Sequence, residues 1–242
     1  MESSAKNGFF SFVIPAHNEA SIIEKTLRHL QELDYPKDRY EVIVVENGST
    51  DATFELASRF ASDSFKIFSS NEKGVSRARN LGATKCSPAL DWCIFMDADV
   101  FLRPTFLREL NAYLLAHPRA GYGTTTVRLD TTNAVGTFWS AVNNFFYRMF
   151  KVLFTIHIVR HELMRKVSYD ENLVSGEDIV YGRALAKYGR YFFMQTNSVS
   201  TSARRFERRG YFKMFFVNMF HGISTYLLPA SLLKKVDWEV IR

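Results

Sequence analysis

The chain runs WCIFMDAD from Trp92 to Asp99. Five apolar residues between polar neighbours are typical of a buried strand, and this strand ends in two carboxylates separated by one small residue. Open α/β sheets bind ligands beyond the carboxyl ends of their strands, so we expect Asp97 and Asp99 to line a ligand site. Neighbouring carboxylates repel each other unless a cation lies between them. Oxygen ligands favour Mg²⁺ or Mn²⁺, which usually bind substrate phosphates as well; the other interpretation is a strand end with two solvated acids.

Strand and helix patterns alternate through the first half of the chain. Apolar runs predict strands at residues 9–15, 40–45, 65–68, 92–96 and 122–129. Helical spacing predicts helices at 21–33, 76–83 and 104–116, and another that ends near residue 61. This alternation predicts an α/β fold, with a mainly parallel central sheet flanked by helices. In the second half we expect helices at 134–153, 177–187 and 210–228, and short strands at 191–194 and 199–201.

The composition fits one domain over residues 1–242, with 47% hydrophobic residues to form a core. The formal charge of +6 favours an anionic partner: a phosphate, a nucleic acid or a lipid surface. No recognisable motif concentrates this charge, which disfavours nucleic acid. Cys86 and Cys93 match neither a zinc site nor a disulfide framework, so they predict a reducing compartment.

Two segments suggest contact with a membrane surface. Residues 214–233 are a run of 20 residues without Asp, Glu, Lys or Arg, which is long enough to cross a bilayer. Polar residues and a proline make this run a poor span, so we expect an amphipathic surface helix there. Aromatic residues between 138 and 154, interleaved with Arg148 and Lys151, are typical of a core but also suit lipid contact. His221 is a candidate metal ligand, although a histidine on an apolar helix more often lies in the interior.

Polar segments follow the first two predicted strands. Residues 15–19 read Pro15-Ala16-His17-Asn18-Glu19, where a doubly wound fold places a nucleotide. The alternative is an ordinary turn in which Asn18 or Glu19 caps the next helix. Residues 46–51 begin with Glu46-Asn47-Gly48, whose acid and amide groups suit contacts to a base or ribose. Asn-Gly is also a favoured turn pair, so turn chemistry alone explains this segment equally well.

Basic residues in two segments are candidates for phosphate contacts. Arg77 and Arg79 lie near the start of the helix predicted at 76–83, and their spacing directs them to different sides of it. We therefore expect at most one of them to reach a ligand. Arg204 and Arg205 are adjacent and suit bidentate phosphate contacts, while the alternative is a solvated basic face.

A second acidic group, Glu177-Asp178, begins a predicted helix after Gly176. Acids at a helix start are stabilised electrostatically, so one interpretation is a well-capped helix. The functional interpretation is a base that removes the proton from an attacking hydroxyl. Displacement of a phosphorylated leaving group needs a metal to neutralise that group and a carboxylate on the opposite side. Asp97, Asp99 and Asp178 supply this combination of groups.

In order along the chain, these motifs resemble the inverting glycosyltransferases of family 2, which have the GT-A fold. The resemblance rests on residues 12–19, 44–51, 74, 78–82, 95–99 and 176–178, and covers about residues 9–205. It implies that residues 9–130 bind a nucleotide-sugar donor and that residues 131–242 bind the acceptor. The charge and the apolar segments described above add the expectation of membrane-surface helices at the C-terminal end. The resemblance also implies that Asp97 and Asp99 hold a divalent metal against the donor diphosphate, and that Asp178 is the base, supported by Glu177.

The residues expected at the donor share a place at strand ends or in basic segments. They are Pro15, Ala16, Glu19, Glu46, Asn47, Arg79, Asp97, Arg204 and Arg205. Many relatives carry two aspartates where this chain has Glu46-Asn47, so the nucleotide stays open among UDP, GDP and dTDP.

The leading hypothesis is a metal-dependent inverting transfer to an acceptor hydroxyl or phosphate that is lipid-linked at the cytoplasmic membrane face, with a saccharide acceptor as the alternative. A nucleotidyltransferase acting on a sugar phosphate is a second class. Such enzymes usually have a Gly-rich loop with Lys or Arg after the first strand, and residues 15–19 do not provide one. A non-catalytic nucleotide-sugar-binding module is a third class, which would tolerate the loss of Asp99 or Asp178, and both are present.

Overall fold

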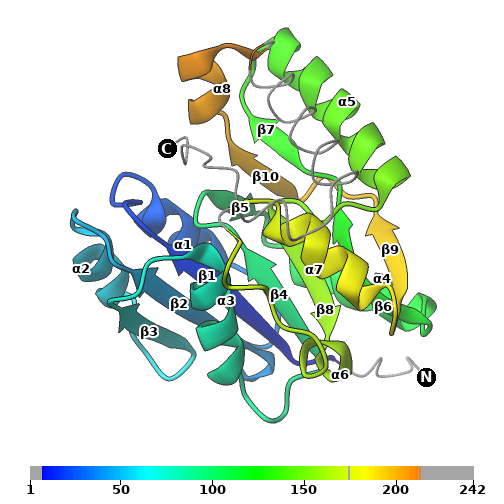
Figure 1. Cartoon of the computed structure of the whole chain (residues 1–242), viewed down its shortest axis with the longest axis horizontal. Coiled ribbons are helices and arrows are strands. Elements are labelled where there is room, and N and C mark those ends of the chain that lie inside the picture. Colours follow the sequence, from blue (N-terminus) through cyan, green and yellow to red (C-terminus); the bar gives the residue numbers. More distant parts are fainter. Residues whose placement is uncertain (1–6, 174, 212, 214–242) are drawn as a thin grey trace.

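The computed structural model describes residues 7–173, 175–211 and 213, and for Arg205, Arg208 and Arg209 it describes the backbone only. Seven strands form the central sheet, in the order β3-β2-β1-β4-β8-β6-β9 (Figure 1). Their bounds are β1 Phe10–Ala16, β2 Tyr40–Asn47, β3 Phe65–Ser70, β4 Trp92–Met96, β6 Ala120–Thr125, β8 Ile156–Arg160 and β9 Arg190–Met194. β1 pairs in parallel with β2 and β4, as do β2 with β3 and β6 with β9, whereas β8 is antiparallel to both neighbours. The prediction of a mainly parallel sheet is confirmed.

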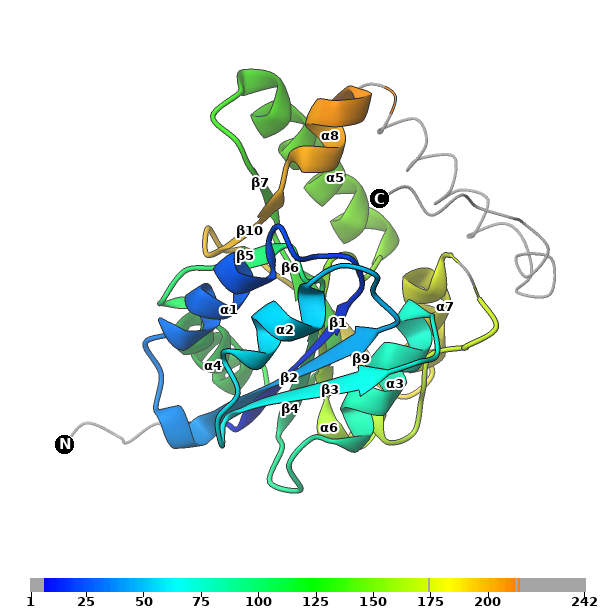
Figure 2. The ribbon, with the colours of Figure 1, turned by 90° about the vertical axis from the view of Figure 1, so that its left-hand side faces the viewer.

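Helices cover both faces of this sheet (Figure 2). The helices are α1 Ile23–Gln31, α2 Thr53–Ser58, α3 Val75–Thr84, α4 Phe106–Ala116, α5 Ala134–Phe150, α6 His161–Met164, α7 Glu177–Leu185 and α8 Arg204–Arg209, with a 3-10 turn η1 at Lys37–Arg39. Successive side chains of a strand point to opposite faces. Phe12 and Ile14 of β1 therefore pack with α1 and α4, while Val13 packs with α3, α6 and α7.

A close contact fixes α3 on β1. A Cβ added to Gly82 would lie 2.4 Å from Val13 Cγ1, so only glycine permits this approach. Because α3 lies this near to the sheet, its inward side chains reach the residues at the ends of the strands.

A second sheet has three strands, in the order β5-β10-β7. They are β5 Val100–Leu102, β7 Arg128–Asp130 and β10 Val199–Ser202. β10 pairs with β5, so it brings Thr201 and Ser202 beside Asp99 although about 100 residues separate them in the sequence. Within the described residues, no helix combines the length and the apolar character needed to span a membrane.

Two sequence predictions need correction, and two strands were missed. Residues 122–129 form two strands in different sheets, because the Asn144 side chain of α5 hydrogen-bonds both backbone groups of Val127 between them. β5 and β8 were not predicted at all. α5 ends at Phe150, since Lys151 has a left-handed backbone (φ 54°) that stops the helix. Most of the predicted helix 210–228, and all of the segment 214–233, lie outside the described residues.

Candidate active site

The two carboxylates after β4 are held by backbone contacts to other strands. Asp97 N–H donates to Thr155 O (3.0 Å), just before β8. Asp99 O accepts the Ser202 N–H (3.0 Å), and Thr201 Oγ1 lies 3.4 Å from Asp99 Oδ1. The Asp97 side chain is 38% exposed and Asp99 is buried. The expectation that both lie at the carboxyl edge of the central sheet is therefore met, although Thr201 was not among the predicted site residues.

Arg79 connects this edge to the second acidic group. Its Nη2 lies 2.9 Å from Asp97 Oδ1, and its Nη1 lies 2.9 Å from Glu177 Oε1. The Arg79 side chain is only 5% exposed. Planar guanidinium groups suit such simultaneous pairing with two carboxylates. Arg79 thus brings together Asp97, which follows β4, and Glu177 of α7, which the sequence separates widely.

Asp178 lies beside these charges at the start of α7. Burial and the neighbouring charge of Glu177 raise the pKa of Asp178 to about 7, and Asp97 acts in the same direction. The Ile179 N–H, which donates to Asp178 Oδ1 (2.8 Å), and Arg79 oppose this pKa shift. A carboxyl group that titrates near neutral pH is suited to accept a proton and to release it again.

Tyr147, near the end of α5, is an electrostatic neighbour of Asp178 that the sequence analysis did not indicate. Burial raises the pKa of Tyr147, and the charge of Asp178 adds to that rise. Its ring stacks on Phe154, with 4.6 Å between centroids. The aromatic run from 138 to 154 gave no signal that singled out this hydroxyl.

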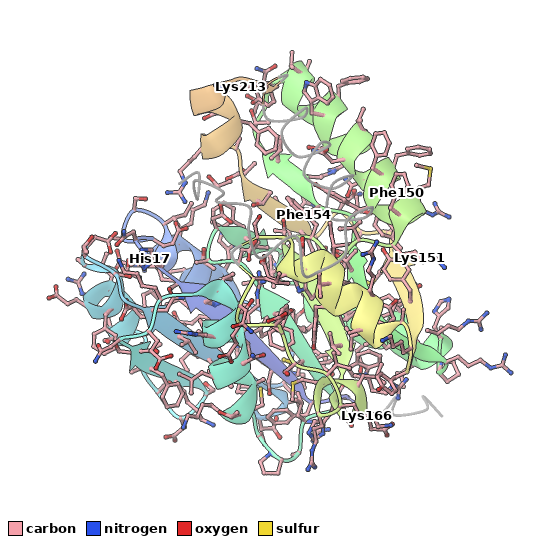
Figure 3. All side chains as sticks on the ribbon, in the orientation of Figure 1. His17, Phe150, Lys151, Phe154, Lys166 and Lys213 are labelled. Atoms are coloured by element: carbon pink, nitrogen blue, oxygen red, sulfur yellow. The ribbon has the colours of Figure 1, made fainter. Side chains whose placement is uncertain are left out.

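The loops after β1 and β2 are joined by hydrogen bonds. Asn18 N–H donates to Ser49 Oγ (3.0 Å), and Asn18 Oδ1 accepts the Thr50 N–H (2.8 Å). Asn18 has a positive φ of 53°, which asparagine tolerates better than most residues. His17, which is labelled in Figure 3, donates from Nδ1 to Asn47 O (2.8 Å) at the end of β2. Parallel pairing of β1 with β2 brings Pro15 and Ala16 close to Glu46 and Asn47 at this edge.

Glu46 and Asn47 are both buried. The Glu46 carboxylate accepts hydrogen bonds from the Ser49 N–H and from Ser69 Oγ on β3. These contacts hold the turn after β2, which is the structural alternative that the Asn-Gly pair allowed.

Arg204 and Glu19 meet across the two sheets. Arg204 Nη2 lies 2.9 Å from Glu19 Oε2, and Arg204 Nη1 donates to Ser21 Oγ (2.7 Å). The Arg204 side chain remains 41% exposed. The side chain of Arg205 and the whole of His221 lie outside the described residues.

The side chains that could bind a divalent metal are the carboxylates after β4. Within the described part of the chain, no group of three or more His, Cys, Asp or Glu residues is arranged to hold a metal ion. Mg²⁺ and Mn²⁺ do not need such a cage, because they usually bind one or two carboxylates together with substrate phosphates and water. Asp97 and Asp99 offer oxygen ligands of this kind.

Comparison with known proteins identifies the family of this chain. The family model "Glycosyl transferase family 2" matches residues 11–174, which is more than half of the chain. The chain belongs to glycosyl transferase family 2. The predicted family and enzyme class, a glycosyltransferase, are therefore confirmed. The matched region contains Pro15, Arg79 and Asp99 but ends before Glu177.

Two curated relatives and one solved structure are similar to this family 2 chain. Glycosyltransferase AglE of Haloferax volcanii is 42% identical over 94 residues, covering 38% of this chain and 30% of AglE. A dolichyl N-acetyl-alpha-D-glucosaminyl phosphate 3-beta-D-2,3-diacetamido-2,3-dideoxy-beta-D-glucuronosyltransferase of Methanococcus voltae is 24% identical, covering 80% of this chain and 66% of that protein. The mannosyltransferase PcManGT of Pyrobaculum calidifontis, solved with GDP-Man and Mn²⁺, aligns at a TM-score of 0.68 with 21% identity, over 96% of this chain and 66% of PcManGT.

The structural likeness confirms the GT-A fold. The matches to these two curated relatives cover 30% and 66% of their lengths, so each relative has a substantial part that this chain does not match.

Proposed function

We propose that this chain is an inverting glycosyltransferase that moves a sugar from a nucleoside diphosphate donor to an acceptor hydroxyl or phosphate. The observation that carries the proposal is the pair of ion pairs from Arg79, which bring Asp97 and Glu177 to one guanidinium beside Asp178. Carboxylates for a metal and a carboxylate for a base thus share one site. Attack on the anomeric carbon from the side opposite the departing diphosphate inverts its configuration.

Asp178 is the proposed base. Its pKa of about 7 lets it take the acceptor proton near neutral pH. Glu177 is hydrogen-bonded to Arg79 and raises the pKa of its neighbour, so it supports Asp178 without acting as a second base.

Asp97 and Asp99 are the proposed ligands of Mg²⁺ or Mn²⁺. When bound, such a cation neutralises charge on the diphosphate leaving group. PcManGT was solved with Mn²⁺ and a nucleotide sugar, which supports the same use here. We do not include His221 in this set, because two carboxylates and the substrate already suit these ions.

The donor half is residues 9–130. Pro15, Ala16 and Asn47 border the carboxyl ends of β1 and β2, where a nucleoside would lie. Glu19 and Arg204 form the rim of this edge, and the exposed part of the Arg204 guanidinium suits a diphosphate. Arg205 is a further candidate for phosphate contact, while Glu46 holds the turn that carries Asn47.

The acceptor half is residues 131–242, and we propose a lipid-linked acceptor at the cytoplasmic face of a membrane. The Methanococcus voltae relative is named for a dolichyl-linked substrate. On α5, five large apolar side chains are more than 40% exposed: Val135, Phe138, Phe145, Met149 and Phe150. Arg148 lies in the last turn of this helix, and Lys151 follows Phe150 directly at its end (Figure 3). Exposed aromatic residues next to basic ones favour an anionic lipid surface.

Calorimetry tests the donor and metal parts together. The whole chain is titrated with UDP, GDP and dTDP, each with and without Mn²⁺, and we expect tight binding of one nucleotide only with the metal. Asp99→Ala should abolish the metal-dependent part of this affinity. Asp34→Ala is the matched control, because Asp34 is an exposed acid whose partner is Arg108 on the surface. Failure of all three nucleotides to bind, or unchanged affinity in Asp99→Ala, would contradict the proposal.

A further inference from the structure

We propose that Arg79 and Asn80, adjacent on α3, are positioning residues that hold the segment leading into α7 against the end of β4, and that Arg79 does not touch the donor. This inference rests on the proposed function, since it concerns how Asp178 is placed relative to Asp97. It gives the Arg-Asn pair a role that differs from the donor contact predicted for Arg79 from the sequence.

The first observation is that the Arg79 guanidinium is buried and already paired, so it is not available to a donor phosphate. Each of its two terminal nitrogens is paired with a carboxylate, Asp97 or Glu177. Its Nε is buried and has no hydrogen-bond partner among the described residues. The guanidinium carbon lies 5.2 Å from the centroid of the Tyr169 ring, a distance at which the ring attracts a cation. A donor phosphate would have to displace one of these carboxylates.

The second observation is that Asn80 binds the backbone of the same residue, Tyr169. Asn80 Oδ1 accepts the Tyr169 N–H (3.0 Å), and Asn80 Nδ2 donates to Tyr169 O (3.0 Å). The Asn80 amide thus satisfies both backbone groups of Tyr169, as a neighbouring strand would, although the segment around Tyr169 is irregular. Asn80 Nδ2 also donates to Glu171 Oε1 (2.8 Å), which ties the segment to α3 a second time.

The third observation is that the Tyr169 ring is fixed from the sheet and from α7. Its hydroxyl is hydrogen-bonded to His157 Nδ1 (2.6 Å) on β8. Its ring stacks on Tyr181 of α7, with 3.8 Å between centroids. Burial and the charge of Arg79 hold the pKa of His157 well below its usual range, so the imidazole is neutral and adds no charge.

These contacts form a continuous path from β4 to the base. Asp97 is paired with Arg79, Arg79 with Glu177, and the residue after Glu177 is Asp178. The Tyr169 ring stabilises the same arrangement through its contact with the Arg79 guanidinium and through its stacking on Tyr181 of α7. A lysine at position 79 would keep the charge but could not hold both carboxylates in this fixed geometry.

Arg79→Lys is the variant that tests the proposal, and Arg77→Lys is its matched control. Arg77 lies two residues away on α3 and is 44% exposed, and among the described residues its ion pairs are with Glu72 and Glu171 at the surface, which a lysine can also pair with. We expect Arg79→Lys to lower kcat about 100-fold, which is the effect of a misplacement near 1 Å. Calorimetric affinity for the nucleotide with Mn²⁺ should stay within about twofold of wild type, because lysine keeps a positive charge beside Asp97 and Arg79 makes no donor contact in this account. Arg77→Lys should change neither quantity.

Tyr169 provides a second test that leaves both ion pairs in place. Tyr169→Phe keeps the ring beneath Arg79 and should retain most of kcat, whereas Tyr169→Leu removes the ring and should lower kcat without weakening nucleotide binding. Equal loss in both variants, or loss in neither, would contradict the role of the ring.

Hydrogen exchange separates this inference from the proposed function. Peptides covering residues 165–173 and 177–185 should exchange faster in Arg79→Lys than in Arg77→Lys, and this readout needs no turnover. Unchanged exchange, or a tenfold weaker nucleotide affinity with kcat retained, overturns the positioning role. A wild-type chain that binds no nucleotide overturns the proposed function, while exchange still decides the role of Arg79.

Discussion

The Arg204 guanidinium on α8 lies 2.9 Å from the Glu19 carboxylate after β1, across 185 residues of sequence. This pair joins the two sheets at the edge where the donor is proposed to bind. Both side chains retain exposed surface, so an anionic ligand can reach the Arg204 guanidinium and replace Glu19 as its partner.

Arg204→Gln should weaken nucleotide diphosphate binding about tenfold, because a charge-assisted hydrogen bond contributes about 1.5–3 kcal/mol. Glu19→Gln should leave affinity equal or higher, since it frees the guanidinium. Calorimetry with Mn²⁺ measures both, and Arg59→Gln, at an exposed arginine paired with Glu24, is the control. Equal weakening by Arg204→Gln and Glu19→Gln would mean that the ion pair itself, rather than the free guanidinium, matters.

The rate of transfer should depend on pH through Asp178. Its pKa is about 7, and only the carboxylate form accepts a proton. We therefore expect kcat/KM to rise with pH through about 7 and then level off. Glu177→Gln removes a charge that raises this pKa, so the rising part of the profile should move to lower pH. A shift to higher pH would contradict the assignment of the base.

The stability of α3 on β1 should depend on Gly82. Gly82→Ala places a Cβ 2.4 Å from Val13 Cγ1, and overpacking of this kind costs about 1–3 kcal/mol. Gly182→Ala is the control on α7, where the new Cβ would have its nearest contact at 3.6 Å, from Leu153. It should be neutral or stabilising by up to about 1 kcal/mol, since alanine favours helix. Thermal unfolding of both variants checks this, and an equal loss in both would show that α3 does not need the close approach.

Membrane binding should depend on the exposed face of α5. Phe138→Ser with Phe145→Ser removes two side chains that are 61% and 62% exposed, and should reduce flotation with anionic liposomes several-fold. Leu115→Ser, at a residue 50% exposed on α4, is the control. Flotation that is the same for the double variant and the control would remove α5 from the membrane surface.

The sequence predicted local features of the fold and site well. The apolar run from Trp92 to Met96 formed β4 because its pattern is local. The spacing of Arg77 and Arg79 predicted that they face different ways, and Arg79 is buried while Arg77 is exposed. These results follow from strand and helix periodicity alone.

Long-range partners could not be predicted in the same way. No pattern near Arg79 indicates Glu177, 98 residues away, or the Asn80 contacts to Tyr169. β8 was missed because its strand character depends on pairing with β4 and β6 on both sides.

The central claim is that the metal-binding carboxylates and the carboxylate that acts as a base share one site. Asp178→Asn tests it most directly, with two measurements: nucleotide-sugar affinity with Mn²⁺ and single-turnover sugar transfer. The amide has nearly the size of the acid but cannot take a proton, so we expect donor affinity close to wild type and a transfer rate lower by about 100-fold or more. Transfer at a near-normal rate would contradict the account.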